Sequence, residues 1–387
     1  MLNRRTSGVL LAFLVVVGLA TALVPGLAAA EIRIGVLLPL SGKASAYGLT
    51  QEVGMKMAVD DLEKTGIKGE PVKLVVYDTR GDNNEAISLT RKLIHTDKVL
   101  AIIGPFFSAE CEVAFPIAVQ GKTPIITAAA AKPGIAAKNR PWAFRNALTS
   151  DKLDGPLIDK WTAANKGKIK QVVILTDIKD AFTKADGTLV FPAVLKARGI
   201  TVLDNVSFQT GDLDFSAQVT KVKSLNPDGI VVAGLYNDGG NVVREIRKQG
   251  MTQPIVGALG MSEGKYIDIA GAAAEGSMVV NPFWADSPEP RIKAWVGEFN
   301  KRSQTPPNNG ATLLYDSLHI MKGCVEKTGV TNRPGDLEKD REKIRDCWTG
   351  LKDYPGVTGT ISMNADGDAV LEPFVLVVRN GKFELVK

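Results

Sequence analysis

Residues 31–48 combine a strand, a turn and the start of a helix in an order that favours anion binding. Residues 32–38 are mostly apolar and predict a strand, and residues 39–42 contain the Pro, Ser and Gly of a turn. In residues 51–64 the apolar side chains recur with helical spacing. Because the first N–H groups of a helix have no partner inside it, they attract a carboxylate or another anion. Open α/β sheets build ligand sites from this arrangement.

Motifs typical of enzymes are incomplete in this sequence. The Gly-Lys-Thr triplet at 121–123 is similar to the end of a phosphate-binding loop, but Pro116 occupies the leading glycine position. Neither His95 nor His319 lies in a motif typical of a general base. Residues 364–368 lack the spacing of a calcium loop and predict a hairpin turn instead. We therefore predict a binding protein that is not an enzyme and uses no metal or other cofactor.

The first 30 residues have the pattern of an export signal. Arg4 and Arg5 precede an apolar run at 9–23, and three alanines at 28–30 precede the charged Glu31. A retained membrane anchor is the alternative, because the uncharged run is long enough to span a bilayer. We expect cleavage after residue 30 and export of the chain that follows.

Export would bring the three cysteines into a compartment where disulfides can form. Cys324 and Cys347 lie in two helical segments, 315–328 and 337–351. A disulfide between them would join the two helices, and an oxidising compartment permits it. Two buried free thiols are the alternative. Cys111 is then left over, and we expect it to act as a small apolar residue in the core of a helix.

Composition describes a globular chain of more than one domain. Of the 387 residues, 45% are hydrophobic and 23% are charged, with a formal net charge of +5. The charged run at 338–343 alternates in sign and predicts a solvated helix face. This balance gives no indication of nucleic-acid binding. The length beyond residue 30 is too great for one modest core, so we expect two domains.

Strand and helix patterns alternate along the chain in two series. The first runs from 32 to 127, and the second runs from 171 to 257 after a polar interval at 132–151. Such alternation predicts an α/β fold of two lobes, each with a doubly wound, mostly parallel sheet. Near the C-terminus, Asn-Gly at 380–381 stands between two apolar runs and predicts a β-hairpin.

Six segments of the chain are similar to a known family. They read IRIGVLLPLSGKASAYG (32–48), VVYDTRGD (75–82), AIIGPFFSAECEVAFPIA (101–118), TPIITAAAAKPGIA (123–136), FRNALTSD (144–151) and NPDGIVVAGLYNDGGNVVREIRKQG (226–250). By their order and spacing, the chain beyond residue 30 resembles the leucine/isoleucine/valine-binding branch of the periplasmic solute-binding proteins. These proteins are the class I clamshell receptors of ABC importers.

The resemblance implies a monomeric two-lobe clamshell in the periplasm that closes on its ligand by a hinge motion and then docks on an ABC permease in the inner membrane. Three crossovers would join the lobes, near Thr149, Val280 and Pro355. The N-terminal lobe would contain residues 31–149 with 280–355, and the C-terminal lobe 150–279 with 356–387.

The resemblance also implies where a ligand binds in the N-terminal lobe. Ser108 matches the serine whose hydroxyl meets the ligand carboxylate, although an ordinary helix N-cap is the alternative. Ala129 matches a position whose backbone contacts the ligand. Tyr47 matches an aromatic residue at the mouth of the cleft, with a surface or core tyrosine as the alternative.

Two positions depart from the pattern of the amino-acid binders in this family. Ala131 replaces a threonine, and Leu259 replaces a carboxylate, and both of the replaced groups hold the ammonium of the ligand. Because an ammonium removed from water without a counter-charge costs several kcal/mol, these changes favour a ligand without an α-amino group. Glu263 leaves this question open, because a shifted loop would bring its carboxylate into the cleft.

The predicted ligand is therefore a small hydrophobic or aromatic carboxylic acid. Aromatic and apolar walls for it are expected from Phe107, Phe182, Leu235 and Tyr236, next to Tyr47 and Phe106. The first alternative is a branched-chain or aromatic amino acid. The second is a sensory role, in which the same clamshell reports its ligand to a membrane signalling partner.

Overall fold

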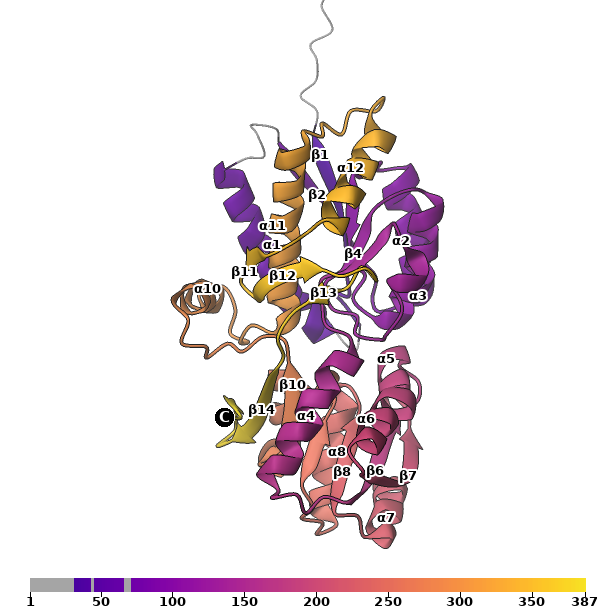
Figure 1. The fold of residues 1–387 in the computed structure, drawn as a ribbon, viewed down its shortest axis with the longest axis vertical. Coiled ribbons are helices and arrows are strands. Elements are labelled where there is room, and N and C mark those ends of the chain that lie inside the picture. The colour runs from indigo at the N-terminus through magenta and orange to yellow at the C-terminus, as the bar shows by residue number, and fades with distance from the viewer. Residues whose placement is uncertain (1–30, 43–44, 66–70) are drawn as a thin grey trace, which may run out of the picture.

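The computed structural model describes residues 31–42, 45–65 and 71–387, so the predicted signal peptide at 1–30 lies outside the described residues. The ribbon forms two lobes, one at each end of the long axis of the molecule (Figure 1). Within the described ranges, no helix is both long and apolar enough to cross a membrane.

The first lobe is built on a fully parallel sheet of five strands. These are β1 (Ile32–Leu38), β2 (Val72–Asp78), β3 (Ala101–Ile103), β4 (Ile125–Thr127) and β5 (Ala143–Arg145), and the first three helices are α1 (Ser45–Thr65), α2 (Asn83–His95) and α3 (Ser108–Gln120). The strands lie in the order β2–β1–β3–β4–β5. Three later helices complete this lobe, namely α10 (Pro290–Asn300), α11 (Asn309–Thr328) and α12 (Leu337–Thr349).

The strands of this sheet are buried on both faces, which explains their apolar sequences. Successive side chains of β1 point to opposite faces, so Val36 packs with the α1 and α11 side while Leu37 packs with α2 and α3. Figure 1 shows these two helix pairs on either side of the sheet. Because helices cover both faces of this sheet, a ligand can reach it only at the ends of its strands.

The second lobe contains a sheet of seven strands. They are β6 (Gln171–Asp177), β7 (Thr201–Phe208), β8 (Gly229–Ala233), β9 (Ile255–Gly257), β10 (Met278–Asn281), β14 (Phe374–Arg379) and β15 (Lys382–Leu385), in the order β15–β14–β10–β9–β8–β6–β7. In this sheet β14 pairs antiparallel with both β10 and β15, and the other pairings are parallel. The helices are α4 (Ser150–Ala164), α5 (Ala181–Ala185), α6 (Phe191–Ala197), α7 (Ser216–Leu225), α8 (Tyr236–Lys248) and α9 (Gly264–Ala270). The predicted α/β fold of two doubly wound lobes is thus confirmed.

The chain crosses between the lobes three times, and the third crossing lies later than predicted. A small antiparallel sheet of β11 (Tyr354–Gly356), β12 (Gly359–Met363) and β13 (Ala369–Val370) belongs to the first lobe. Asp316 of α11 holds it there by accepting hydrogen bonds from the N–H groups of Val357 (2.7 Å) and Thr358 (2.8 Å). The chain therefore enters the second sheet at β14 and not near Pro355, and Asp316, distant in sequence, is one of the residues that hold the short strands to the first lobe.

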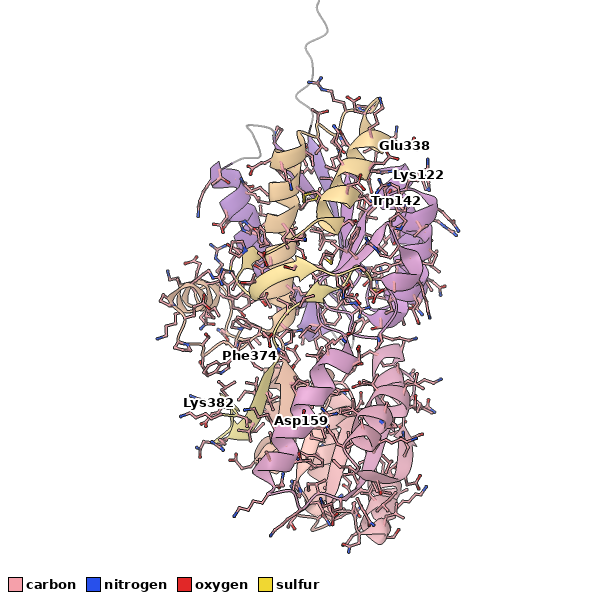
Figure 2. All side chains as sticks on the ribbon, in the orientation of Figure 1. Lys122, Trp142, Asp159, Glu338, Phe374 and Lys382 are labelled. Carbon is pink, nitrogen blue, oxygen red and sulfur yellow. A yellow bond between two sulfur atoms is a disulfide. The ribbon has the colours of Figure 1, made fainter. Side chains whose placement is uncertain are left out.

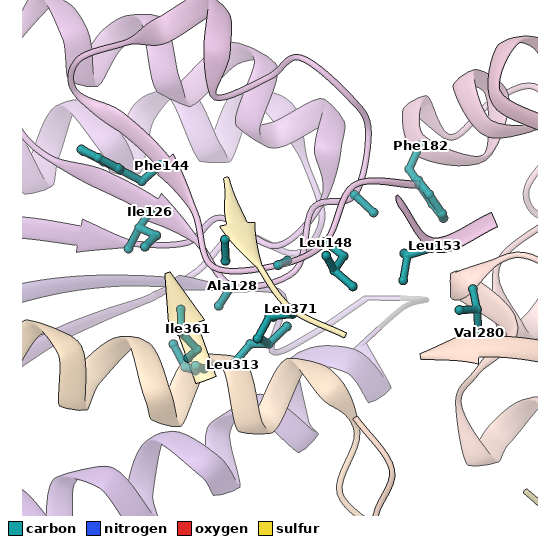
Figure 3. Close-up of a cluster of buried hydrophobic side chains, with 14 of the residues drawn as sticks. Ile126, Ala128, Phe144, Leu148, Leu153, Phe182, Val280, Leu313, Ile361 and Leu371 are labelled. Atoms are coloured by element: carbon teal, nitrogen blue, oxygen red, sulfur yellow. The ribbon is translucent and has the colours of Figure 1, made fainter. Parts of the chain in front are cut away.

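The hydrophobic core continues from one lobe into the other. Figure 3 shows Ile126 and Phe144 in the first lobe and Phe182 and Val280 in the second, with Leu148 between them. All five side chains are buried and belong to one cluster. The first crossover therefore passes through packed apolar side chains.

The structure joins Cys324 of α11 to Cys347 of α12 by a disulfide, with the two Cα atoms 5.8 Å apart. Cys111 is a free thiol buried in the core of the first lobe. An ion pair of Lys122 and Glu338 also links the end of α3 to α12 (Figure 2). Because both of its side chains are exposed and screened by solvent, this pair contributes little, and the disulfide is the stronger link to α12.

Candidate functional site

The two sheets meet at the ends where ligand sites form in parallel α/β folds. In the first sheet β1 lies between β2 and β3, and in the second β6 lies between β7 and β8. At such points the connections leave for opposite faces of the sheet and open a crevice at the carboxyl ends of the strands. Loops after β1, β3, β4, β6, β8 and β9 surround one pocket between the lobes.

The pocket gathers nearly all of the predicted ligand-binding residues. Its empty space is about 450 Å³, including its opening to solvent. Only Tyr236 of the predicted set is outside the lining. The lining contains Tyr47, Phe107, Ser108, Ala129, Ala131, Phe182, Leu235 and Leu259.

One end of the pocket is suited to a carboxylate. Ser108 is the first residue of α3, so its hydroxyl lies beside the unpaired N–H groups of the first helical turn. The backbone N–H of Lys132 donates to Ser108 Oγ (3.3 Å), which leaves the hydroxyl proton of Ser108 for another acceptor. Glu110 accepts from the N–H of Phe107 (3.0 Å) and fixes the start of the helix.

Behind the pocket lining at this end, a buried arginine holds the loop that follows β4. Arg145 of β5 is fully buried, and its Nη1 donates to the carbonyls of Ala130 and Lys132, both at 2.9 Å. These carbonyls flank Ala131, so the guanidinium holds the loop that lines the pocket. Asp368 provides the counter-charge, with its Oδ1 2.9 Å from Arg145 Nε. The sequence analysis missed this pair because the two residues are far apart in the chain.

The opposite wall carries two carboxylates that no lysine or arginine of the lining offsets. Glu263 comes from the loop before α9, and removal from water raises its pKa to about 7. Its Oε2 accepts a hydrogen bond from Asn308 Nδ2 (2.8 Å). Burial also raises the pKa of Asp180, which caps α5 by accepting from the N–H groups of Phe182 and Thr183. Glu263 therefore lines the pocket, as the alternative left open in the sequence analysis requires.

Aromatic rings form the apolar wall and connect the lobes. The ring of Tyr47 lies 4.9 Å from those of Phe106 and Tyr236, and 6.0 Å from that of Phe107, measured between ring centroids. Tyr236 belongs to the second lobe and stands against Tyr47 rather than in the pocket lining. The Tyr47 hydroxyl also donates to the carbonyl of Gly260 across the cleft (2.9 Å). In this structure the two lobes are therefore closed over the pocket.

Six further residues line the pocket, and of these the sequence analysis named only Phe106 and Glu263. Phe106, Ala130, Asp180, Gly260, Glu263 and Asn309 also border the pocket. A signal for Asp180 exists in the sequence, since an Asp directly before a helical segment is a common N-cap. In the described part of the chain, no three His, Cys, Asp or Glu side chains are grouped so that they could hold a metal ion.

Two lobes that face each other with the carboxyl ends of their strands, and that close over a small pocket, define a clamshell receptor. The family described as periplasmic binding protein matches residues 31–382. This chain belongs to that family, whose members bind small ligands, work with ABC transporter permeases and are not enzymes.

Individual relatives are similar along nearly the whole chain. The Leu/Ile/Val-binding protein BraC3 of Rhizobium johnstonii is 28% identical over 354 residues, which are 90% of this chain and 92% of that protein. The structure of LivJ from Streptococcus pneumoniae with isoleucine has a TM-score of 0.81 at 28% identity, covering 92% of this chain and 98% of that chain. A solute binding protein from R. palustris with benzoate has a TM-score of 0.80 at 21% identity, covering 92% and 95%, and shares the fold. The predicted class I clamshell fold and family are confirmed.

We predict that Arg145→Met destabilises the protein by about 3–5 kcal/mol, because it leaves the Asp368 carboxylate buried without a counter-charge. The double variant Arg145→Met/Asp368→Asn should lose less, since no uncompensated charge remains. Urea unfolding followed by circular dichroism at pH 7 measures both. Equal losses in the single and double variants would contradict the pairing.

Proposed function

We propose that this protein is the extracytoplasmic substrate-binding protein of an ABC importer and that its ligand is a small apolar α-amino acid. The observation that carries the ligand class is Glu263, an acidic residue of the pocket lining with no cationic neighbour in that lining. A partly buried carboxylate of this kind favours a ligand that brings a positive charge. The ammonium of an amino acid supplies it.

The rest of the pocket fits the other parts of such a ligand. The start of α3 and the hydroxyl of Ser108 suit the ligand carboxylate. The rings of Phe106, Phe107 and Phe182 offer an apolar wall for its side chain. Relatives that are named for leucine, isoleucine and valine binding support the same ligand class.

A small aromatic or hydrophobic carboxylic acid is the second candidate. It is favoured by Ala131 and Leu259, because both line the pocket and neither side chain can hold an ammonium. With such a ligand Glu263 would take up a proton on closure, since burial raises its pKa to about 7. The two candidates therefore predict different charges for Glu263, which is ionised with an amino acid and neutral with an acid that lacks the amine.

Thermal unfolding with paired ligands separates the two candidates. The protein from Glu31 onward, freed of carried-over ligand by unfolding and refolding, is tested with leucine, valine and phenylalanine, with the 2-oxo acid or phenylpropanoate that lacks the amine, and with benzoate. We expect stabilisation by the amino acids, about 2.7 kcal/mol at a hundredfold excess over Kd. Stabilisation by the amine-free acids alone would contradict an amino-acid ligand.

We further predict that Glu263→Gln lowers the affinity for leucine about ten- to a hundredfold, because a hydrogen bond to a charged group contributes about 1.5–3 kcal/mol. The affinity for benzoate, measured by calorimetry, should not fall. Asp268→Asn is the matched control, since Asp268 is an exposed acid on α9, the helix that follows Glu263. If Glu263→Gln binds leucine as the wild type does, Glu263 is not the partner of the ammonium.

A further inference from the structure

Asn308 uses both ends of its amide, one within its own lobe and one across the cleft. It precedes α11, where its Oδ1 accepts from the N–H of Ala311 (2.9 Å) and caps the helix. Its Nδ2 donates to Glu263 Oε2 (2.8 Å) in the other lobe. The side chain is buried, with 6% of the residue exposed. Because the cap fixes the rotamer, the N–H₂ group points to the position that Glu263 occupies on closure.

The segment 259–263 receives a second contact across the cleft and one from its own lobe. The hydroxyl of Tyr47 in α1 donates to the carbonyl of Gly260 (2.9 Å). Within the second lobe, Asn281 of β10 donates from Nδ2 to Ser262 Oγ (3.0 Å) and holds the same segment in place. Of these contacts, only that of Asn308 reaches an ionisable group. The first lobe therefore contacts the second at segment 259–263, which also carries Glu263.

We propose that Asn308 is a positioning residue that makes ligand selection depend on closure, by holding the Glu263 carboxylate at the pocket only in the closed form. This inference rests on the proposed amino-acid ligand. In an open cleft Glu263 would be solvated, and closure removes it from water. Two groups then replace the water, namely the amide of Asn308 and the ammonium of the ligand.

The contacts of Glu263 with Asn308 and with the ligand select between ligands with and without an ammonium group. A ligand with an ammonium completes the surroundings of Glu263, so closure costs little. A ligand without one leaves the partly buried carboxylate with Asn308 alone, and closure then requires either an uncompensated charge or the uptake of a proton. Asp180 adds a second acid to the same lining and increases this penalty for an anionic ligand.

A purely structural role as helix cap predicts different behaviour, and Asn308→Ser separates the two. Serine is as good an N-cap as asparagine, so α11 keeps its cap. The shorter hydroxyl does not extend to Glu263 as the amide does, so the contact between the lobes is lost. An unchanged urea midpoint of the ligand-free variant verifies that the cap is retained.

The test compares the affinities of wild type and Asn308→Ser for leucine and for benzoate, with closure followed by small-angle X-ray scattering. We expect the affinity for leucine to fall about tenfold or more, as for a lost hydrogen bond to a charged group, and that for benzoate to fall less. In a Glu263→Gln background the same substitution should cost little, because Asn308 acts through the charge of Glu263. Full affinity and normal closure with both probes in Asn308→Ser would overturn the proposal.

The outcomes also distinguish this inference from the proposed function. If the wild type closes on benzoate and not on leucine, the amino-acid ligand is wrong. Weaker closure of Asn308→Ser on benzoate would then still support the contact between the lobes. An equal loss in the wild-type and Glu263→Gln backgrounds would show that Asn308 does not act through Glu263, and would overturn the inference while leaving the ligand class intact.

Discussion

A parallel strand must be followed by a connection that returns over its sheet, so the carboxyl ends of all such strands in a lobe lie at one edge. The pocket depends on this constraint. Residues as distant in sequence as Tyr47, Ser108 and Ala131 come together because they follow β1, β3 and β4 of one sheet. The second sheet presents the same kind of edge from the other side. The two edges face each other because the three crossovers join the lobes next to the pocket.

Within the pocket, the two walls differ in electrostatic character. The first lobe offers the start of α3 and the hydroxyl of Ser108, both of which favour a negative group, while Arg145 is already paired with Asp368 and holds the loop behind them. The second lobe offers Glu263 and Asp180, which favour a positive group. A ligand that carries both charges satisfies both walls when the lobes close. This complementarity ties the choice of ligand to the closure of the fold.

Much of the fold and most of the pocket follow from local sequence. The strand and helix patterns place the two sheets, and the resemblance of short segments places Ser108 and Ala129. Other features depend on contacts between distant residues. Gly239 and Gly240 lie inside α8, and the sequence does not reveal that α8 approaches Met261 and Ile269 too closely for a Cβ at these positions. Asp316 helps to hold the strands before the third crossover, and Asn308 contacts Glu263 from more than 40 residues away.

The central claim is that Glu263 stays ionised in the closed complex because the ligand brings an ammonium. Calorimetric titration with leucine at pH 6, in two buffers of different ionisation enthalpy, measures the protons exchanged on binding. An ionised Glu263 predicts no net exchange with leucine. With benzoate, the raised pKa of Glu263, about 7 and so above the pH of the titration, predicts a net uptake of protons. Uptake of nearly one proton with leucine itself would mean that Glu263 is neutral in the complex, and would contradict the account.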